Sequence, residues 1–243
     1  LRFTPQASRS FTLLLALDTA TTTASLALYD LQADQLLSEY TWEARRRQTQ
    51  DLLVTAQQML AQIGQTAQAL TALAVTMGPG SFTGVRIGIS TVKGIGVGLP
   101  TRPKVIGVPT LAVTSAPWLT LMQRTTPAAK LCAIIHAGRG RYNWAFFDAD
   151  ALYWRPTADD HAGGTVDDLI AALHGAEAPA VWLTGESDQT IAAAVAPLSH
   201  VTLLDPVSSW RRAGQLARLA ALHFAAGTED DLAALQPLYL RNP

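Results

Sequence analysis

The chain of 243 residues contains little cysteine and little charge, and both shortages exclude classes of protein. Its single cysteine, Cys132, excludes an internal disulfide framework and a zinc site built from several cysteines. Charged residues make up 15% of the sequence, whereas about 25% is typical of globular domains. Because hydrophobic residues reach 49%, the chain is neither disordered nor fibrous, and much of it must be buried core.

An excess of basic residues is also absent. Lys and Arg together number 18 and Asp and Glu 19, which gives a formal charge of −1. A protein that binds nucleic acid on its own usually carries a basic surplus that neutralises phosphates, so the composition argues against that role. The one run of three basic residues, 45–47, is either a solvated loop or helix start, or a contact to RNA phosphate or to an acidic partner.

Motifs of metalloenzymes, hydrolases and membrane proteins are missing as well. The five histidines form no HExxH or HxxxH pair, so neither a metallopeptidase nor another histidine-based metal site is expected. No apolar run approaches the roughly 18 residues of a membrane span. Arg2 and Arg9 before the apolar run 11–17 loosely imitate a signal peptide, but Asp18 ends that run. We therefore expect a first core strand and a cytoplasmic protein.

The residues that are present predict strands first, followed by alternating strands and helices. In the first half, strands are expected at 12–17, 24–29, 35–42, 69–76 and 105–108, and helices at 48–63 and from Ser81 or Thr83 to about 99. In the second half, strands are expected at 131–135, 144–148, 151–153 and 180–184, and helices at 110–121, 166–173, 189–195 and 209–224. This order predicts a mixed α/β architecture with two lobes.

The same patterns suggest a division of the chain. Residues 1–10 are expected to form an N-terminal tail and residues 11–114 a first lobe. Residues 115–208 would form a second, smaller lobe, and the helix at about 209–226 is expected to pack back on the first. An extended C-terminal tail, 227–243, completes the prediction.

A glycine-rich turn precedes the second helix and could bind an anion. The sequence Gly-Pro-Gly-Ser-Phe-Thr-Gly at 78–84 allows backbone N–H groups to converge at a helix N-terminus, where phosphates bind well. A tight turn that only packs a helix closely is the alternative. Asp18 and the threonines after it could hold a phosphate or a metal, or Asp18 could simply cap a turn. No lysine follows the turn, so it is not a Walker A loop.

Small residues recur along the helix after this turn. Gly84 and Gly88 are one turn apart, with Thr91, Gly94 and Gly96 further along. Small residues at this spacing let another helix approach closely. The second helix belongs either to the same domain or to another subunit, and the sequence leaves both readings open.

Four motifs resemble the bacterial TsaB (YeaZ) family. They are residues 15–21 (LALDTAT), 78–89 (GPGSFTGVRIGI), 106–111 (IGVPTL) and 237–241 (PLYLR), in matching order and spacing. The resemblance implies a two-lobed actin/sugar-kinase/Hsp70-like (ASKHA) fold, with mixed sheets and flanking helices. Two stretches depart from the family pattern: Gln48-Thr49 replaces a usual His-Ser/Thr, and 136–143 (HAGRGRYN) replaces an Asp-Ala-Arg-x-x-Glu-Val-Tyr stretch.

The resemblance also implies a function. It suggests a non-catalytic scaffold subunit that binds and activates TsaD, which makes N6-threonylcarbamoyladenosine beside the anticodon of tRNA. The ATPase TsaE would join the complex, and tRNA would be reached only indirectly. No catalytic residue, metal site or cofactor is expected on this chain, with ATP and Mg²⁺ entering only in the assembled complex.

Particular residues follow from the resemblance. The helices at 48–63 and 83–98 would form a helix-bundle interface with TsaD, or with a second TsaB copy. The interface residues expected are Gln48, Leu52, Leu53, Ala56, Met59, Gly84, Gly88 and Thr91. Residual nucleotide or phosphate loops would be formed by Asp18, Thr19, Gly78, Gly80, Ser81 and Thr83. A small kinase or ATPase of the same fold, resting on these loops, is the alternative function.

Overall fold

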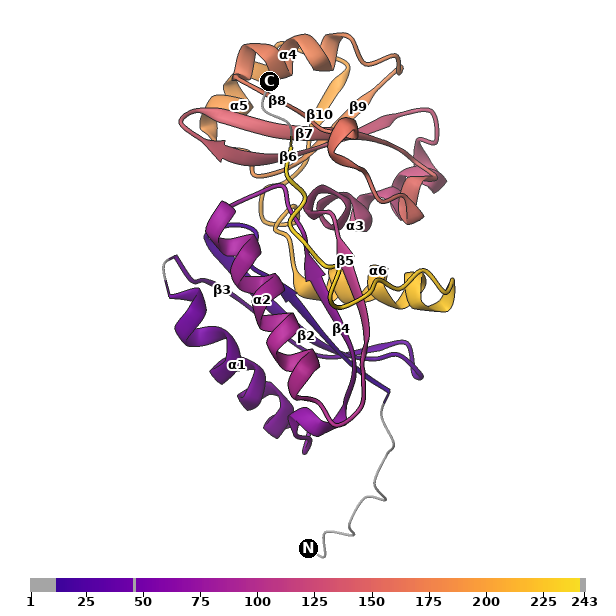
Figure 1. Ribbon diagram of the computed structural model, residues 1–243. Coiled ribbons are helices and arrows are strands. Elements are labelled where there is room, and N and C mark those ends of the chain that lie inside the picture. Colours follow the sequence, from indigo (N-terminus) through magenta and orange to yellow (C-terminus); the bar gives the residue numbers. More distant parts are fainter. Residues whose placement is uncertain (1–11, 46, 241–243) are drawn as a thin grey trace, which may run out of the picture.

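The computed structural model describes residues 12–45 and 47–240, and these form two lobes that each contain a five-stranded sheet (Figure 1). The first sheet has the strand order β3-β2-β1-β4-β5. Its strands are β1 (Leu13–Asp18), β2 (Thr23–Asp30), β3 (Gln35–Glu43), β4 (Leu70–Thr76) and β5 (Lys104–Val108). β1 pairs antiparallel with β2 and parallel with β4, so the sheet is mixed. The predicted α/β class with mixed sheets is confirmed.

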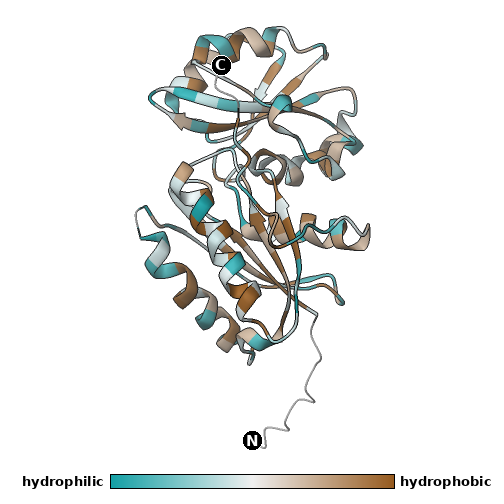
Figure 2. Ribbon diagram, viewed as in Figure 1, coloured by the Kyte–Doolittle hydropathy of each residue, from teal (hydrophilic) through white to brown (hydrophobic). Residues whose placement is uncertain are grey.

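Helices cover both faces of the first sheet. Helices α1 (Gln48–Gln62) and α2 (Phe82–Gly98) lie on one face, against β2 and β4. Helix α6 (Ala213–Ala225) packs against β1 and β2 on the other face, although it comes last in the chain (Figure 1). Because both faces are covered, β1 is apolar from residue 13 to 17 and every one of its residues, Asp18 included, is buried. Figure 2 shows the resulting concentration of apolar residues on these strands.

The second lobe has the strand order β10-β9-β6-β7-β8. Its elements are β6 (Lys130–Gly138), β7 (Arg141–Asp148), β8 (Ala162–Gly164), α4 (Val166–His174), β9 (Val181–Gly185), α5 (Gln189–Val195) and β10 (Val201–Leu203). Helix α3 (Thr110–Thr125) packs on both β6 and α6, so one core cluster joins the two lobes. The division proposed after residue 114 therefore falls inside α3. The predicted tail 1–10 lies outside the described residues.

Two predicted elements of the second half are wrong. Residues 151–153 are not a strand but a short 3₁₀-helix, Ala151–Tyr153, because β7 already pairs along β6 and the hairpin turn lies before it, at 139–140. The last helix begins at Ala213 and not at residue 209. The backbone N–H of Ala213 donates to Ser25 Oγ (2.8 Å), which fixes the start of α6 on β2.

The C-terminal segment after α6 crosses the first lobe beside α2. Asp230 bridges to Val105 at the outer edge of β5, and its carboxylate accepts from the backbone N–H of Gly107 (2.8 Å). Further along, the backbone N–H of Leu238 donates to the Met77 carbonyl oxygen (2.8 Å). This segment therefore covers the free edge of the sheet and ends near the first turn of α2 (Figure 1).

Candidate functional site

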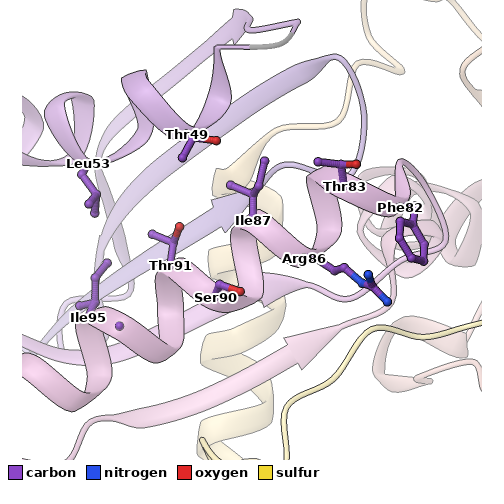
Figure 3. A pocket seen from close by; sticks show the side chains of 10 residues that line it. Thr49, Leu53, Phe82, Thr83, Arg86, Ile87, Ser90, Thr91 and Ile95 are labelled. Carbon is purple, nitrogen blue, oxygen red and sulfur yellow. The ribbon is translucent and has the colours of Figure 1, made fainter.

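A groove of about 690 Å³ runs between α1 and α2 on the outer side of the first lobe (Figure 3). Leu53 points into it from α1, and Ile87 and Ile95 point into it from α2. The complete lining is Thr49, Leu53, Phe82, Thr83, Arg86, Ile87, Ser90, Thr91, Gly94 and Ile95. Arg86 is the one charged residue among these ten, so the groove is an apolar surface that meets water.

The groove exists because each helix turns its other apolar residues toward the sheet. On α1, Leu52 is 2% exposed whereas its neighbour Leu53 is 50% exposed. On α2, Val85 and Ile89 are buried in the same core. Since successive helical residues are rotated by about 100°, the next residues along each helix form a second, outward stripe. On α2 that stripe includes Gly94, where an added Cβ would meet no atom within 4 Å.

The structure corrects the role predicted for Gly84 and Gly88. Both are buried on the inner face of α2. A Cβ at Gly84 would collide with the Thr19 carbonyl oxygen, and one at Gly88 would lie 2.5 Å from the Thr19 hydroxyl and 3.1 Å from a Val75 methyl group. These glycines therefore let α2 approach β1 and β4 within the lobe. They do not make room for a helix of another subunit.

The other predicted interface residues divide between the groove and the core. Leu53 and Thr91 line the groove. Gln48 is buried, and its Nε2 donates to the Thr21 carbonyl oxygen (2.6 Å). The residues that pack on the sheet are Leu52, Ala56 and Met59. The two helices are confirmed as secondary structure, but most of the residues named on them lie on the inward face, and the partner interface stays a prediction.

Sequence reasoning missed most of the groove. The lining residues it did not name as part of an interface are Thr49, Phe82, Thr83, Arg86, Ile87, Ser90, Gly94 and Ile95. A usable signal was present, because Ile87, Thr91 and Ile95 repeat every four residues on α2. That repeat is separate from the one formed by Val85, Ile89 and Val92, which is buried. Two apolar repeats on one helix indicate two packed faces.

A second, smaller cavity of about 200 Å³ lies where the lobes meet. Its walls come from Thr21 and Thr23 of the first lobe, from Glu186 of the second, and from Trp210 and Arg211 of the segment that leads into α6. Arg211 connects this cavity to Asp18, the first of the predicted phosphate-loop residues.

Asp18, the first of the predicted phosphate-loop residues, is bound by Arg211. Arg211 Nε donates to the Asp18 carboxylate (2.5 Å), and the two side chains are 7% and 2% exposed. Asp18 Oδ1 also accepts from the backbone N–H of Ala20 (3.0 Å) and from the Thr76 hydroxyl (3.1 Å). Burial alone would lower the pKa of Arg211, but attraction to Asp18 and Glu186 outweighs burial and raises that pKa. The cleft is therefore occupied by an internal cation.

The glycine-rich turn uses its hydrogen-bond donors inside the chain. The backbone N–H of Gly78 donates to Thr110 Oγ1 (3.1 Å), and that of Ser81 donates to the Ala20 carbonyl oxygen (2.6 Å). Gly80 has φ +153°, and a Cβ there would collide with the Ala20 carbonyl oxygen. The turn thus packs directly on the loop after β1, which leaves no room for a phosphate between them.

The remaining loop residues lie in or bind the first turn of α2. Ser81 Oγ accepts from the backbone N–H of Gly84 (3.2 Å), which makes Ser81 the N-cap, as one of the two predicted alternatives. The Thr19 hydroxyl donates to the Gly84 carbonyl oxygen (2.7 Å), and Thr83 lines the outer groove. Because these groups bind one another and Arg211 already neutralises Asp18, the residues present do not fit the phosphates of a nucleotide.

The buried pair gives a prediction about stability. We expect Arg211→Met to lower the free energy of unfolding by about 3–5 kcal/mol, because it leaves the Asp18 carboxylate buried without its counter-charge. Adding Asp18→Asn removes that charge and keeps a side chain that can still accept from Ala20, so the double variant should recover part of the loss. Urea unfolding of the unaltered chain, the single variant and the double variant measures these differences in the free energy of unfolding. A double variant less stable than Arg211→Met alone would contradict this account.

In the second lobe, the stretch that departs from the family pattern holds a small polar cluster. The Tyr142 hydroxyl donates to Asp188 (2.9 Å), and His136 Nε2 lies 3.4 Å from the same carboxylate. Burial, aided by Asp188, raises the pKa of Tyr142 to about 12, so it remains a neutral donor. The backbone N–H of His136 donates to Glu186 (2.9 Å). Asp188 also caps α5, which gives the cluster a structural role.

Neither a metal cluster nor a membrane helix is found in the described ranges. Within 12–45 and 47–240, no three His, Cys, Asp or Glu residues are grouped so that they could hold a metal ion. Over the same residues, every helix is too short or too polar to cross a membrane.

Together, these features define a class. The two lobes, each with a five-stranded mixed sheet, are those of the ASKHA-like α/β proteins. Arg211 lines the inter-lobe cleft, and an apolar groove lies on the outside of the first lobe. Solved structures share this fold. A Pseudomonas aeruginosa protein described as similar to peptidase YeaZ superposes with a TM-score of 0.69 at 24% identity, covering 95% of this chain and 100% of that one. YeaZ from Pseudomonas aeruginosa has a TM-score of 0.64 at 23% identity, covering 94% and 100%.

Sequence comparisons define the family. The family model "TsaD: tRNA N6-adenosine threonylcarbamoyltransferase" matches residues 40–202, which is more than half of the chain. The Escherichia coli K12 protein named "tRNA threonylcarbamoyladenosine biosynthesis protein TsaB" is 29% identical over 233 residues, or 94% of both chains. A Haemophilus influenzae protein of the same name is 39% identical over 92 residues, which are 37% of this chain and 38% of that one. The chain belongs to the TsaB (YeaZ) family, within the wider group that the TsaD model describes.

Proposed function

We propose that this chain is a non-catalytic subunit in the biosynthesis of threonylcarbamoyladenosine in tRNA, and that it binds and activates a TsaD-type protein through the groove between α1 and α2. The observation that carries the proposal is the groove itself: an outward apolar stripe on two adjacent helices, open to water and built over an already complete core. The names of the curated relatives support the pathway.

The shape of the groove favours a helix as the docking element. Packed helices lie about 8–10 Å apart, and small side chains at the contact allow the closest approach. Ser90 and Gly94 supply such small residues on α2, and Leu53 and Ile95 stand on either side as apolar walls. One or two partner helices placed here would complete a helix bundle.

The non-catalytic part of the proposal is supported by the inter-lobe cleft. Arg211 and Asp18 neutralise each other where a phosphate would otherwise bind, and the glycine-rich turn is closed on the loop after β1. The transfer chemistry is therefore assigned to the TsaD-type partner. A TsaE-type ATPase would join the complex of this chain with the TsaD-type partner. The chain would reach tRNA only indirectly, within that complex.

This assignment predicts the behaviour of the isolated chain toward nucleotide. Titration with ATP and Mg²⁺ in a calorimeter should give no binding heat, and no ADP should accumulate on incubation. An Arg211→Met variant serves as the comparison, because it tests whether removal of the internal cation opens the cleft. Saturable ATP binding with turnover by the unaltered chain would instead support the alternative, a small kinase or ATPase of the same fold.

Reconstituted tRNA modification tests the proposed function as a whole. The TsaD-type and TsaE-type proteins of the same organism are combined with tRNA and the substrates of the pathway, with and without this chain. The modified nucleoside is measured by mass spectrometry after digestion. Omission of the chain should abolish or strongly reduce the product, and undiminished product without it would refute the proposal.

A further inference from the structure

A polar cavity of about 200 Å³ lies between the lobes, beside the buried pair of Arg211 and Asp18. Its wall combines Thr21 from the first lobe, Glu186 from the second, and Trp210 from the segment before α6. At about 30 Å³ for each water molecule, this volume corresponds to about six or seven water molecules. A single bare ion would fill only a small part of it, whereas an organic molecule of a few non-hydrogen atoms fits.

Ser209 contributes an unsatisfied hydroxyl to the wall of this cavity. The residue is 5% exposed, and among the described residues its Oγ has no hydrogen-bond partner. The turn that carries it is held by two bonds to Asp205: the backbone N–H of Ser209 donates to the carbonyl oxygen (2.9 Å) and that of Ser208 donates to Oδ2 (2.7 Å). A buried polar group without a partner destabilises a fold, so this hydroxyl points to a bound molecule that satisfies it.

The charges around the cavity favour a cation. Asp18 and Arg211 neutralise each other, and Arg211 Nη2 also donates to the Thr21 hydroxyl (3.3 Å), so this guanidinium is already engaged. Glu186 Oε2 accepts from the backbone N–H of His136 (2.9 Å), which is a neutral donor. None of the ion pairs among the described residues involves Glu186. Two carboxylates and one guanidinium thus leave one negative charge at the cavity.

Trp210 favours an organic cation over an inorganic one. Its side chain lines the cavity and is 50% exposed, so it lies where the cavity meets solvent. Among aromatic side chains, the indole attracts ammonium groups most strongly, and its apolar surface also packs against carbon atoms. An anionic molecule would instead face the like charge of Glu186.

We propose that this cavity binds a small organic ammonium compound that also carries a hydroxyl group. The ammonium donates to the Glu186 carboxylate, and the hydroxyl bonds to Ser209. Because the wall comes from both lobes, the bound molecule links the second lobe to the first. This site goes beyond the proposed function and does not depend on docking at the groove between α1 and α2, so each can fail without the other.

Titration with two molecules of the same size tests the charge preference. Ethanolamine has an ammonium and a hydroxyl group, and ethylene glycol has a second, neutral hydroxyl in place of the ammonium. Binding is followed by NMR through the backbone amides of the full chain at constant ionic strength. We expect ethanolamine to shift the amides of Glu186 and Ser209 with a dissociation constant on the order of 1 mM, because so small a ligand has little surface to bury. Ethylene glycol should bind at least about 10-fold more weakly.

Two variants separate recognition from folding. Glu186→Gln keeps the shape and removes the charge, so the preference for ethanolamine over ethylene glycol should disappear. Ser209→Ala removes the unsatisfied hydroxyl, so ethanolamine should bind about three- to tenfold more weakly, while the melting temperature without ligand stays the same or rises. Glu177→Gln removes a carboxylate at a different cavity and is the matched control, which should bind like the unaltered chain.

Four results would overturn the inference. Equal binding of ethanolamine and ethylene glycol, or no shift with either at about 50 mM, far above the expected dissociation constant, would exclude a site for ammonium compounds. Potassium chloride that shifts the same amides and displaces ethanolamine would make this an inorganic ion site. A lower melting temperature of Ser209→Ala with unchanged ethanolamine binding would show that this hydroxyl serves the fold alone.

Discussion

Gly94→Leu should weaken binding of a TsaD-type partner by up to about 100-fold while leaving the chain as stable as before, or slightly more so. An added side chain at Gly94 meets nothing within the chain and projects into the groove. Overpacking of a close contact costs about 1–3 kcal/mol, which corresponds to a loss of affinity of up to about 100-fold. In the free chain, leucine in place of an exposed helical glycine stabilises the helix by up to about 1 kcal/mol.

Two further variants separate the effect of side-chain size in the groove from the effect of the substitution on helix stability. Gly94→Ala gains most of the helical stabilisation but adds only a methyl group, so it should weaken binding much less than Gly94→Leu. Gly98→Leu makes the same substitution one turn further along, where space is also open but the groove lining has ended. Isothermal titration gives the affinities and thermal melting gives the stabilities. Equal affinities for Gly94→Leu and the unaltered chain would place the partner elsewhere.

Gly88→Leu should have the opposite effect on the same helix. A Cβ at Gly88 already lies 2.5 Å from the Thr19 hydroxyl and 3.1 Å from Val75, and the rest of a leucine would have to displace the end of β1. We expect a loss of about 3 kcal/mol or more, because the surrounding core is closely packed. That loss is a large share of the roughly 5–15 kcal/mol that holds a typical domain together.

Chemical unfolding and expression yield measure this effect. Gly88→Leu should unfold at a clearly lower urea concentration than Gly94→Leu, although the two sites are six residues apart on one helix. Any loss of partner binding by Gly88→Leu would then follow from unfolding and would not report on the interface. A Gly88→Leu chain as stable as the unaltered one, but unable to bind, would restore the interface role first predicted for Gly88.

The fold was largely predictable because its signals are local. Continuous apolar runs marked β1 and β4, and an apolar repeat with a serine cap marked α2. The resemblance to a known family added the lobes and their order. The wrong element bounds occur where contacts between distant residues set the start of an element. For example, α6 begins at Ala213, whose backbone N–H binds the distant Ser25. The local bond from the Arg212 backbone N–H to Gln215 also marks this start, but the contact to Ser25 is not visible in the sequence around residue 213.

The candidate site was predictable at the level of helices but not of residues. Glycines on α2 were read as one set, yet Gly84 and Gly88 pack on Thr19 whereas Gly94 faces the groove. Spacing alone cannot tell which face of an apolar, glycine-rich helix lies on the sheet. Nor could it show that Arg211 would meet Asp18 from 193 residues away and close the cleft.

Site-specific photo-crosslinking tests the central claim, docking at the groove between α1 and α2, most directly. A photoreactive amino acid is placed at Leu53, which lines the groove, or at Tyr153, which lies on a different surface and is similarly exposed (50% and 58%). Each chain is irradiated with the TsaD-type protein of the same organism, and the products are mapped by mass spectrometry. The account predicts a crosslink to a helix of that protein from position 53 and none from position 153. Crosslinking from 153 alone, in a sample where binding is measured, would contradict it.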